Sequence, residues 1–89
     1  MEFEWDIEKA RSNLEKHGVS FDEACTVFSD THSSTVLDPE HSEREIRFIT
    51  FGLSNTGRGL VIAHADRGNR VRIISARPMT PKERRAYEQ

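Results

Sequence analysis

The chain has 89 residues, which suits one small domain with a single modest core and is too short for two. It is polar, with 35% hydrophobic and 31% charged residues, but its apolar residues come in periodic blocks, which argues against a disordered chain. One cysteine excludes an internal disulfide, and no apolar run approaches the roughly 18 residues of a membrane helix. We therefore expect a cytoplasmic protein that is neither exported nor membrane-spanning.

The net charge of −2 conceals an uneven distribution of charge along the chain. Residues 1–45 contain 12 acidic and 4 basic residues, whereas residues 67–89 contain 2 acidic and 7 basic residues. Clustered Lys and Arg attract polyanions and supply the salt-dependent part of nucleic-acid binding. The basic C-terminal quarter makes RNA a candidate partner, although charge alone favours a simple solvated surface.

The first elements in chain order are a short strand and a helix. Apolar residues at Phe3–Trp5 indicate an edge or first strand. Asp6 can cap a helix that runs to His17, and Gly18 can end it. One apolar stripe of this helix would contain Ile7, Ala10, Arg11 and Leu14.

A second helix and a polar segment follow. Ser20 and Glu23 form a capping-box pattern for a helix over Phe21–Phe28, so the two helices predict an N-terminal helical hairpin. Residues Ser29–Ser42 are polar, with one possible short strand at Thr35–Leu37.

The second half predicts three strands and a last helix. Ile46–Leu53, Leu60–Asp66 and Arg70–Ala76 are rich in β-forming residues and are separated by short turn sequences, so they predict an antiparallel meander. Thr80 as a cap, followed by proline and Glu83, predicts a short helix that ends at Tyr87. The predicted fold is a single α+β domain over residues 1–89.

Two loop lengths set the expected register, because strand side chains alternate between faces. If Leu53 opposes Leu60 and Asp66 opposes Arg70, one face is almost wholly apolar and should lie under the two N-terminal helices. That face would carry Ile46, Phe48, Thr50, Val61, Ala63, Ala65, Val71, Ile73 and Ser75.

The opposite face would be mixed, with His64 opposite Arg72 and Arg47 opposite Asp66. Arginine, histidine and scattered apolar groups on an open sheet suit an RNA backbone with stacked bases. The alternative, equally weighted, is that Arg47 and Asp66 form an ion pair and that the apolar groups pack under the last helix.

Several segments resemble the BrnT family of type II toxin–antitoxin modules. They are Phe3 to Asp6, Lys9-Ala10, Lys16 to Phe21, Glu23-Ala24, Val27-Phe28, Asp38-Pro39, His41-Ser42, Glu45, Arg47, Arg72 to Arg77, Glu83-Arg84 and Tyr87. Pro78-Met79 departs from the Arg-Ala type of continuation associated with the family. Together the matching segments span nearly the whole chain.

The resemblance implies a RelE-like ribonuclease fold and RNA cleavage that arrests translation. It also implies neutralisation by a BrnA-like antitoxin with a ribbon-helix-helix part, in a heterotetramer that contacts operator DNA only through the antitoxin. A non-catalytic RNA- or protein-binding module using the same basic face is the alternative.

RNA cleavage without a metal needs a base for the 2′-hydroxyl, cations for the charge on phosphorus and an acid for the 5′-oxygen. Arg72 and Arg77 are the best candidates for a phosphate clamp, because a guanidinium stays charged and can bond two oxygens. They can meet one phosphate only if the strand ends or bulges near Ser75. A structural salt bridge is the alternative for each.

For proton transfer His64 is the first choice because an imidazole titrates near neutrality, with Glu45 and Tyr87 as further candidates. The alternatives are a half-buried sheet histidine for His64 and a packed C-terminal anchor for Tyr87. His17 is assigned to the helix end, and His32 and His41 carry little signal. Further RNA contacts are expected from Arg47, Arg70, Lys82, Arg84 and Arg85. We predict no metal and no cofactor, since no ligand pattern is present.

Overall fold

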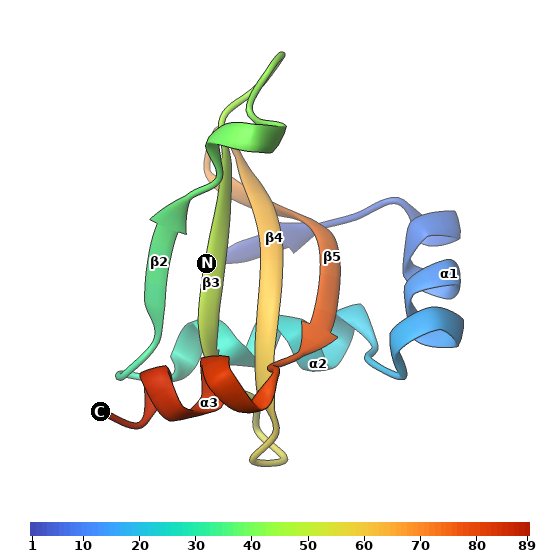
Figure 1. The fold of residues 1–89 in the computed structure, drawn as a ribbon. Helices are drawn as coiled ribbons and strands as arrows, with labels where there is room; N and C mark the ends of the chain where they lie inside the picture. Colours follow the sequence, from blue (N-terminus) through green and yellow to red (C-terminus); the bar gives the residue numbers. More distant parts are fainter.

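The computed structural model describes residues 1–89 and has a five-stranded sheet at its centre (Figure 1). The strands lie in the order β1-β5-β4-β3-β2. Neighbours from β2 to β5 are antiparallel, whereas β1 is parallel to β5. The strand bounds are β1 (Glu2–Glu4), β2 (Ser34–Leu37), β3 (Arg47–Leu53), β4 (Gly59–Arg67) and β5 (Arg70–Pro78). The predicted α+β class and the edge position of the first strand are confirmed.

Three α-helices surround the sheet, and their ends follow local capping signals. They are α1 (Ile7–His17), α2 (Phe21–Thr26) and α3 (Pro81–Tyr87), with single 3₁₀ turns at Val27–Ser29 and Pro39–His41. The Asp6 carboxylate accepts hydrogen bonds from two backbone N–H groups of α1, and Gly18 ends that helix at φ +68°. None of the helices is long and apolar enough to cross a bilayer.

The two expected capping boxes have different outcomes. That of α3 is complete, since Thr80 and Glu83 bond each other's backbone N–H groups. In α2, Ser20 accepts the N–H of Glu23, but the Glu23 carboxylate instead accepts from Arg58 Nε at 3.0 Å. The charge of Arg58 outcompetes a neutral backbone donor for that carboxylate.

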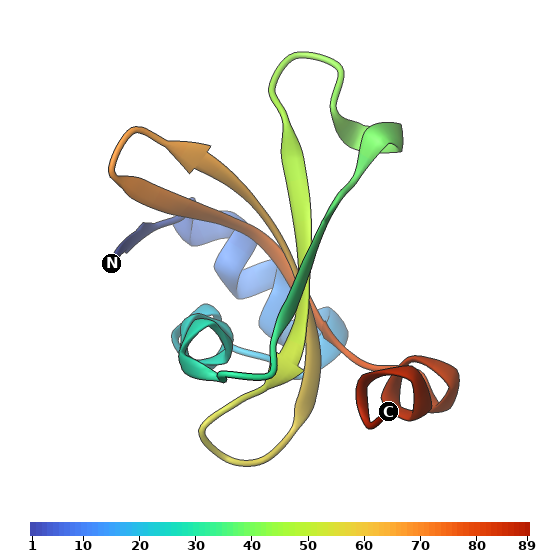
Figure 2. The same ribbon diagram turned by 90° about the vertical axis from the view of Figure 1, so that its left-hand side faces the viewer.

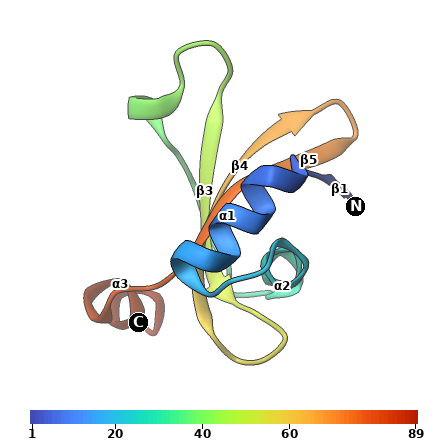
Figure 3. The ribbon, with the colours of Figure 1, turned by 90° about the vertical axis from the view of Figure 1, so that its right-hand side faces the viewer.

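The expected hairpin does not lie flat on one face of the sheet. Helix α2 covers a face, whereas α1 runs beside the edge of β5, and α3 lies on the opposite side (Figures 2 and 3). The predicted stripe of α1 lies on one side of the helix, but it does not pack on the sheet as expected, because Ile7 is 69% exposed and Leu14 is 51% exposed. The buried core consists of Val19, Phe21, Ala24, Val27, Leu60, Ile62, Ile73 and Ala76.

Helix α1 is attached to the edge of β5 through the polar side chain of Asn13, rather than through an apolar stripe. Asn13 is buried, and its amide donates to the carbonyls of Val19 at 2.9 Å and Ala76 at 2.8 Å. Its carbonyl accepts the N–H of Ala76 at 3.0 Å. Asn13 therefore bonds the edge of β5 as a neighbouring strand would.

The observed pairing of β4 with β3 and with β5 differs from the expected register by one residue in each case. Leu60 opposes Gly52, because the β3–β4 turn contains only residues 54–58, with Gly57 at φ +82°. Arg70 opposes Arg67 across a two-residue turn that begins with Gly68 at φ +66°. A shift of one residue moves the side chains of β4 to the face opposite the expected one. The covered face therefore includes Leu60, Ile62 and His64, and the residues between them face the open side.

A β-bulge in β5 changes the positions of the two candidate clamp residues. Ala63 pairs with Ser75, but the next residue of β4 pairs with Ile73, so Ile74 has no partner. Arg72 and Arg77 are an odd number of residues apart and would otherwise point to opposite faces. The bulge places both arginines on the open face. A bulge near Ser75 was the requirement for both arginines to meet one phosphate.

Candidate active site

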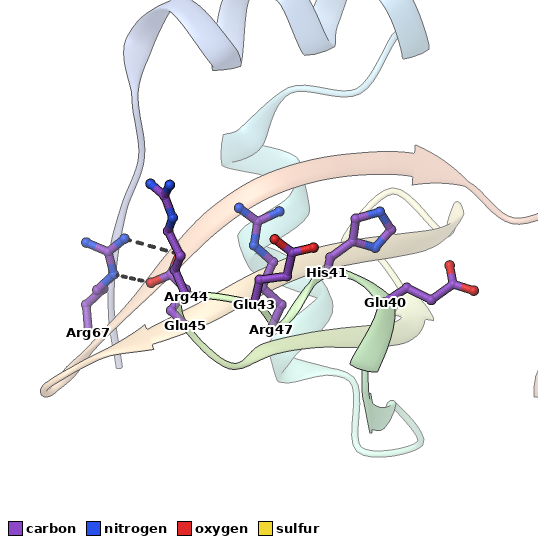
Figure 4. Close-up of a pocket in the computed structure, with 7 residues that line it drawn as sticks. All are labelled: Glu40, His41, Glu43, Arg44, Glu45, Arg47 and Arg67. Atoms are coloured by element: carbon purple, nitrogen blue, oxygen red, sulfur yellow. Dashed lines mark hydrogen bonds and ion pairs between the residues drawn. The ribbon is translucent and has the colours of Figure 1, made fainter.

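The open face contains two adjoining hollows that share His41 and Arg47. One, of about 300 Å³, is lined by Asp38, His41, Arg47, Ile49, Val61, Ala63, Ile74, Ser75 and Arg77. The other, of about 650 Å³, is wholly polar and is lined by Glu40, His41, Glu43, Arg44, Glu45, Arg47 and Arg67. Figure 4 shows the side chains of the larger hollow, which come from the β2–β3 connection, the start of β3 and the end of β4.

An aspartate orients His41 in this site. Nδ1 of His41 lies 2.9 Å from Oδ2 of Asp38, whose side chain is 12% exposed, while the histidine side chain is 62% exposed. The turn is held by the N–H of Asp38, which donates to the carbonyl of Arg47 at 2.9 Å. A carboxylate on Nδ1 favours the Nδ1–H tautomer and leaves Nε2 free to accept a proton. Sequence reasoning gave His41 little weight, although its spacing from Asp38 within the family-like segment was a usable signal.

Arg47 supplies a cation without a carboxylate partner. It lies on β3 opposite Ala65, and its Nε is buried with no hydrogen-bond partner. A buried guanidinium N–H without an acceptor is costly, and no carboxylate pairs with Arg47, so the guanidinium that lines the hollows favours an incoming anion. The sequence placed Arg47 among the RNA contacts, and the structure places it beside His41 in both hollows.

The two predicted clamp residues are held by carboxylates. Arg77 donates from Nη1 and Nη2 to the two oxygens of Glu83 at 2.8 and 2.9 Å, and this pairing lowers the pKa of Glu83 to about 2. Arg72 Nη1 lies 2.8 Å from Oε2 of Glu4 on the neighbouring β1. Arg77 lines the smaller hollow, whereas Arg72 lines neither hollow and lies in the same cross-strand row as Ala65 and Arg47.

The predicted position of His64 is wrong. It is 5% exposed, lies on the covered face between Phe28 and Phe48, and has Nε2 2.7 Å from the Thr50 hydroxyl. Burial lowers the pKa of His64, because the charged imidazole loses its hydration. It opposes Ile73 rather than Arg72, because of the altered register.

Tyr87 and Glu45, the other two candidates for proton transfer, are bound to other side chains. Tyr87 donates its hydroxyl to Asp30, and this bond raises the pKa of the phenol. Glu45 accepts from Arg67 Nε at 3.0 Å on the rim of the larger hollow, and the pairing lowers the pKa of its carboxyl. Both groups therefore resist changing their charge near neutral pH.

The remaining predicted RNA contacts are dispersed. Arg70 lies 3.4 Å from a Glu2 oxygen near the β4–β5 turn, and Arg84 pairs with Glu88 on α3. Lys82 borders a separate hollow of about 490 Å³ beside α3, and Arg85 is exposed without an ion pair. No group of three or more His, Cys, Asp or Glu side chains is arranged to hold a metal ion.

Comparison with known proteins gives a family and a related structure. Residues 5–83 match the model of the ribonuclease toxin, BrnT, of type II toxin–antitoxin systems. The fold is similar to the 1.1 Å crystal structure of the Brucella abortus ribonuclease toxin BrnT, with a TM-score of 0.66, 22% sequence identity, and coverage of 90% of this chain and 97% of that chain. No curated protein matches the sequence.

The matched segment includes the β2–β3 connection and strands β3, β4 and β5, which together line the two hollows. It covers well over half of the chain. The chain belongs to the BrnT family of ribonuclease toxins of type II toxin–antitoxin systems.

Proposed function

We propose that this chain cleaves RNA without a metal in the hollow lined by His41, Arg47 and Arg77. The observation that carries the proposal is the Asp38–His41 pair beside the unpartnered Nε of Arg47. A base held by a carboxylate next to an unpaired guanidinium is what 2′-hydroxyl activation and phosphate binding require. The family supports ribonuclease activity, and the geometry supports the choice of residues.

In the proposed step, His41 Nε2 takes the proton of the 2′-hydroxyl as that oxygen bonds to phosphorus. The bond from phosphorus to the 5′-oxygen breaks, which leaves a 2′,3′-cyclic phosphate and a free 5′-hydroxyl. Arg47 stabilises the charge that develops on the phosphoryl oxygens. The departing oxygen takes its proton from water, because the smaller hollow contains no second side chain that normally titrates near neutrality.

Arg77 is proposed as a second phosphate ligand that binds through its free Nε. Its Nη atoms bind Glu83, but Nε has no bonded partner and the side chain is 42% exposed. A phosphate can therefore approach while the ion pair is intact. Arg72 is proposed to act at longer range, since Glu4 occupies its Nη1.

The proposal is tested with purified protein, a labelled single-stranded RNA and excess EDTA. We expect cleavage that ends in cyclic phosphates and falls strongly for Arg47→Ala, with Arg11→Ala, at an exposed position on α1, as a matched control. Intact RNA after prolonged incubation would overturn the catalytic proposal. Salt-sensitive binding without scission would select the non-catalytic binding module.

The family also supports proposals about biology. We expect the chain to arrest translation in the cytoplasm, to adopt a RelE-like arrangement, and to be neutralised by a BrnA-like ribbon-helix-helix antitoxin in a heterotetramer that reaches operator DNA through the antitoxin. Co-expression with a BrnA-like protein, followed by light scattering of the purified complex, tests the partner and the stoichiometry.

A further inference from the structure

A third hollow lies on the α1 side of β5 and continues the candidate active site. It measures about 190 Å³ and is lined by Lys9, Ser12, Asn13, Lys16, His17, Ile74 and Ser75. Ile74 and Ser75 also line the hollow that contains His41 and Arg77. The two hollows therefore meet over the bulge in β5.

No strand separates them, because β1 covers only one end of β5. Pairing between these strands stops at Glu4 and Arg72. Beyond that point α1 runs along the edge (Figure 3), and Asn13 bonds both backbone groups of Ala76. The path from the open face to α1 crosses only the bulge residues.

The cations on this side have no partners within the chain. Lys9, Lys16 and His17 form no ion pair or side-chain hydrogen bond, and none of the residues that line their hollow is acidic. Asp6, which lies near Lys9, is committed to the N–H groups at the start of α1. The cations therefore remain available to an external anion.

The spacing of the lysines suits an extended anion. Lys9 and Lys16 lie on the same stripe of α1, roughly 10 Å apart along its axis. Seven arginines, including Arg11 on the same helix, form ion pairs with carboxylates, whereas Lys9 and Lys16 form none and keep an unneutralised charge.

We infer that single-stranded RNA continues from the phosphate site across the bulge and that Lys9 and Lys16 bind its backbone phosphates, with His17 beside them. The inference rests on the proposed RNA substrate, and it assigns to the acidic N-terminal half a part of the RNA surface. The contacts are electrostatic, so they extend the footprint without reading bases.

The test compares the wild-type chain with the double variant Lys9→Ala/Lys16→Ala in binding 2′-O-methyl RNA, which lacks the attacking hydroxyl. For an RNA of about a dozen nucleotides we expect affinity to fall roughly tenfold at low salt and the salt slope to shrink by about 1.4, the value for two lost single-strand phosphate contacts. A trinucleotide should lose much less. Arg11→Gln, on another stripe of α1, is the control for charge.

Unchanged affinity and salt slope for the longer RNA would overturn the inference. Loss of binding to the antitoxin with unchanged RNA binding would also overturn it, in favour of a protein partner on this surface. Because the probe cannot be cleaved, the result does not depend on catalysis. Absence of cleavage with natural RNA would count against the proposed function alone.

Discussion

The Arg77 guanidinium and the Glu83 carboxylate face each other through two hydrogen bonds of 2.8 and 2.9 Å. The same carboxylate accepts the backbone N–H of Thr80 at 2.8 Å. The Glu83 side chain thus caps the first turn of α3 and also neutralises the Arg77 guanidinium that a phosphate would bind. The C-terminal helix and the candidate active site are therefore connected.

Replacing Glu83 with Gln should strengthen RNA binding. Glutamine can still complete the capping box, but it no longer neutralises Arg77. We expect the dissociation constant for non-cleavable RNA to fall roughly threefold to tenfold, which anisotropy measures, at a stability cost of about 1 kcal/mol. Glu88→Gln, which frees Arg84 instead, is the control. An unchanged dissociation constant would remove Arg77 from the phosphate site.

Replacing His41 with Ala should abolish most of the cleavage. Loss of a general base costs typically 10²–10⁴ in rate, so kcat should fall by about that factor while KM changes little. Asp38→Asn should give a smaller fall, because the ring keeps its base but loses its orienting carboxylate. His32→Ala, on an exposed loop, serves as the control, and equal rates for all three variants would rule out His41 as the base.

His64 should affect stability rather than catalysis. Its pKa is lowered from the ordinary 6.5 by burial, so the unfolded chain binds the proton more readily. The contribution of neutral His64 is therefore complete above about pH 6.5 and is lost as the pH falls toward the lower folded-state pKa, partly offset by nearby Asp66. Urea unfolding at several pH values should show this slope in the wild type and a smaller one in His64→Gln. Cleavage per folded molecule should be unchanged.

Asn13 should be a large contributor to stability for a polar residue. Asn13→Ala leaves the N–H and carbonyl of buried Ala76 without their partners, so we expect a loss of about 2–4 kcal/mol in the free energy of unfolding. Asn55→Ala, on the exposed β3–β4 turn, is the comparison. Similar losses for both variants would mean that α1 does not depend on this amide.

The helix ends could be predicted from sequence because their signals are local. Asp6 and Gly18 delimit α1, and Thr80 with Glu83 begins α3, through contacts between residues a few positions apart. The strands were recognisable for the same reason. The family resemblance further included Asp38-Pro39, His41-Ser42 and the last strand among its matching segments.

Which side chains share a face was decided only by tertiary structure. Faces alternate at every residue, so a turn one residue shorter was enough to move His64 to the covered face, and the bulge at Ile74 brought Arg72 and Arg77 to one side. Turn length and bulge position depend on packing between distant segments, such as the α2 core under Leu60 and the bond from Asn13 to β5. Residue types therefore revealed the available chemistry, whereas long-range packing determined which groups meet.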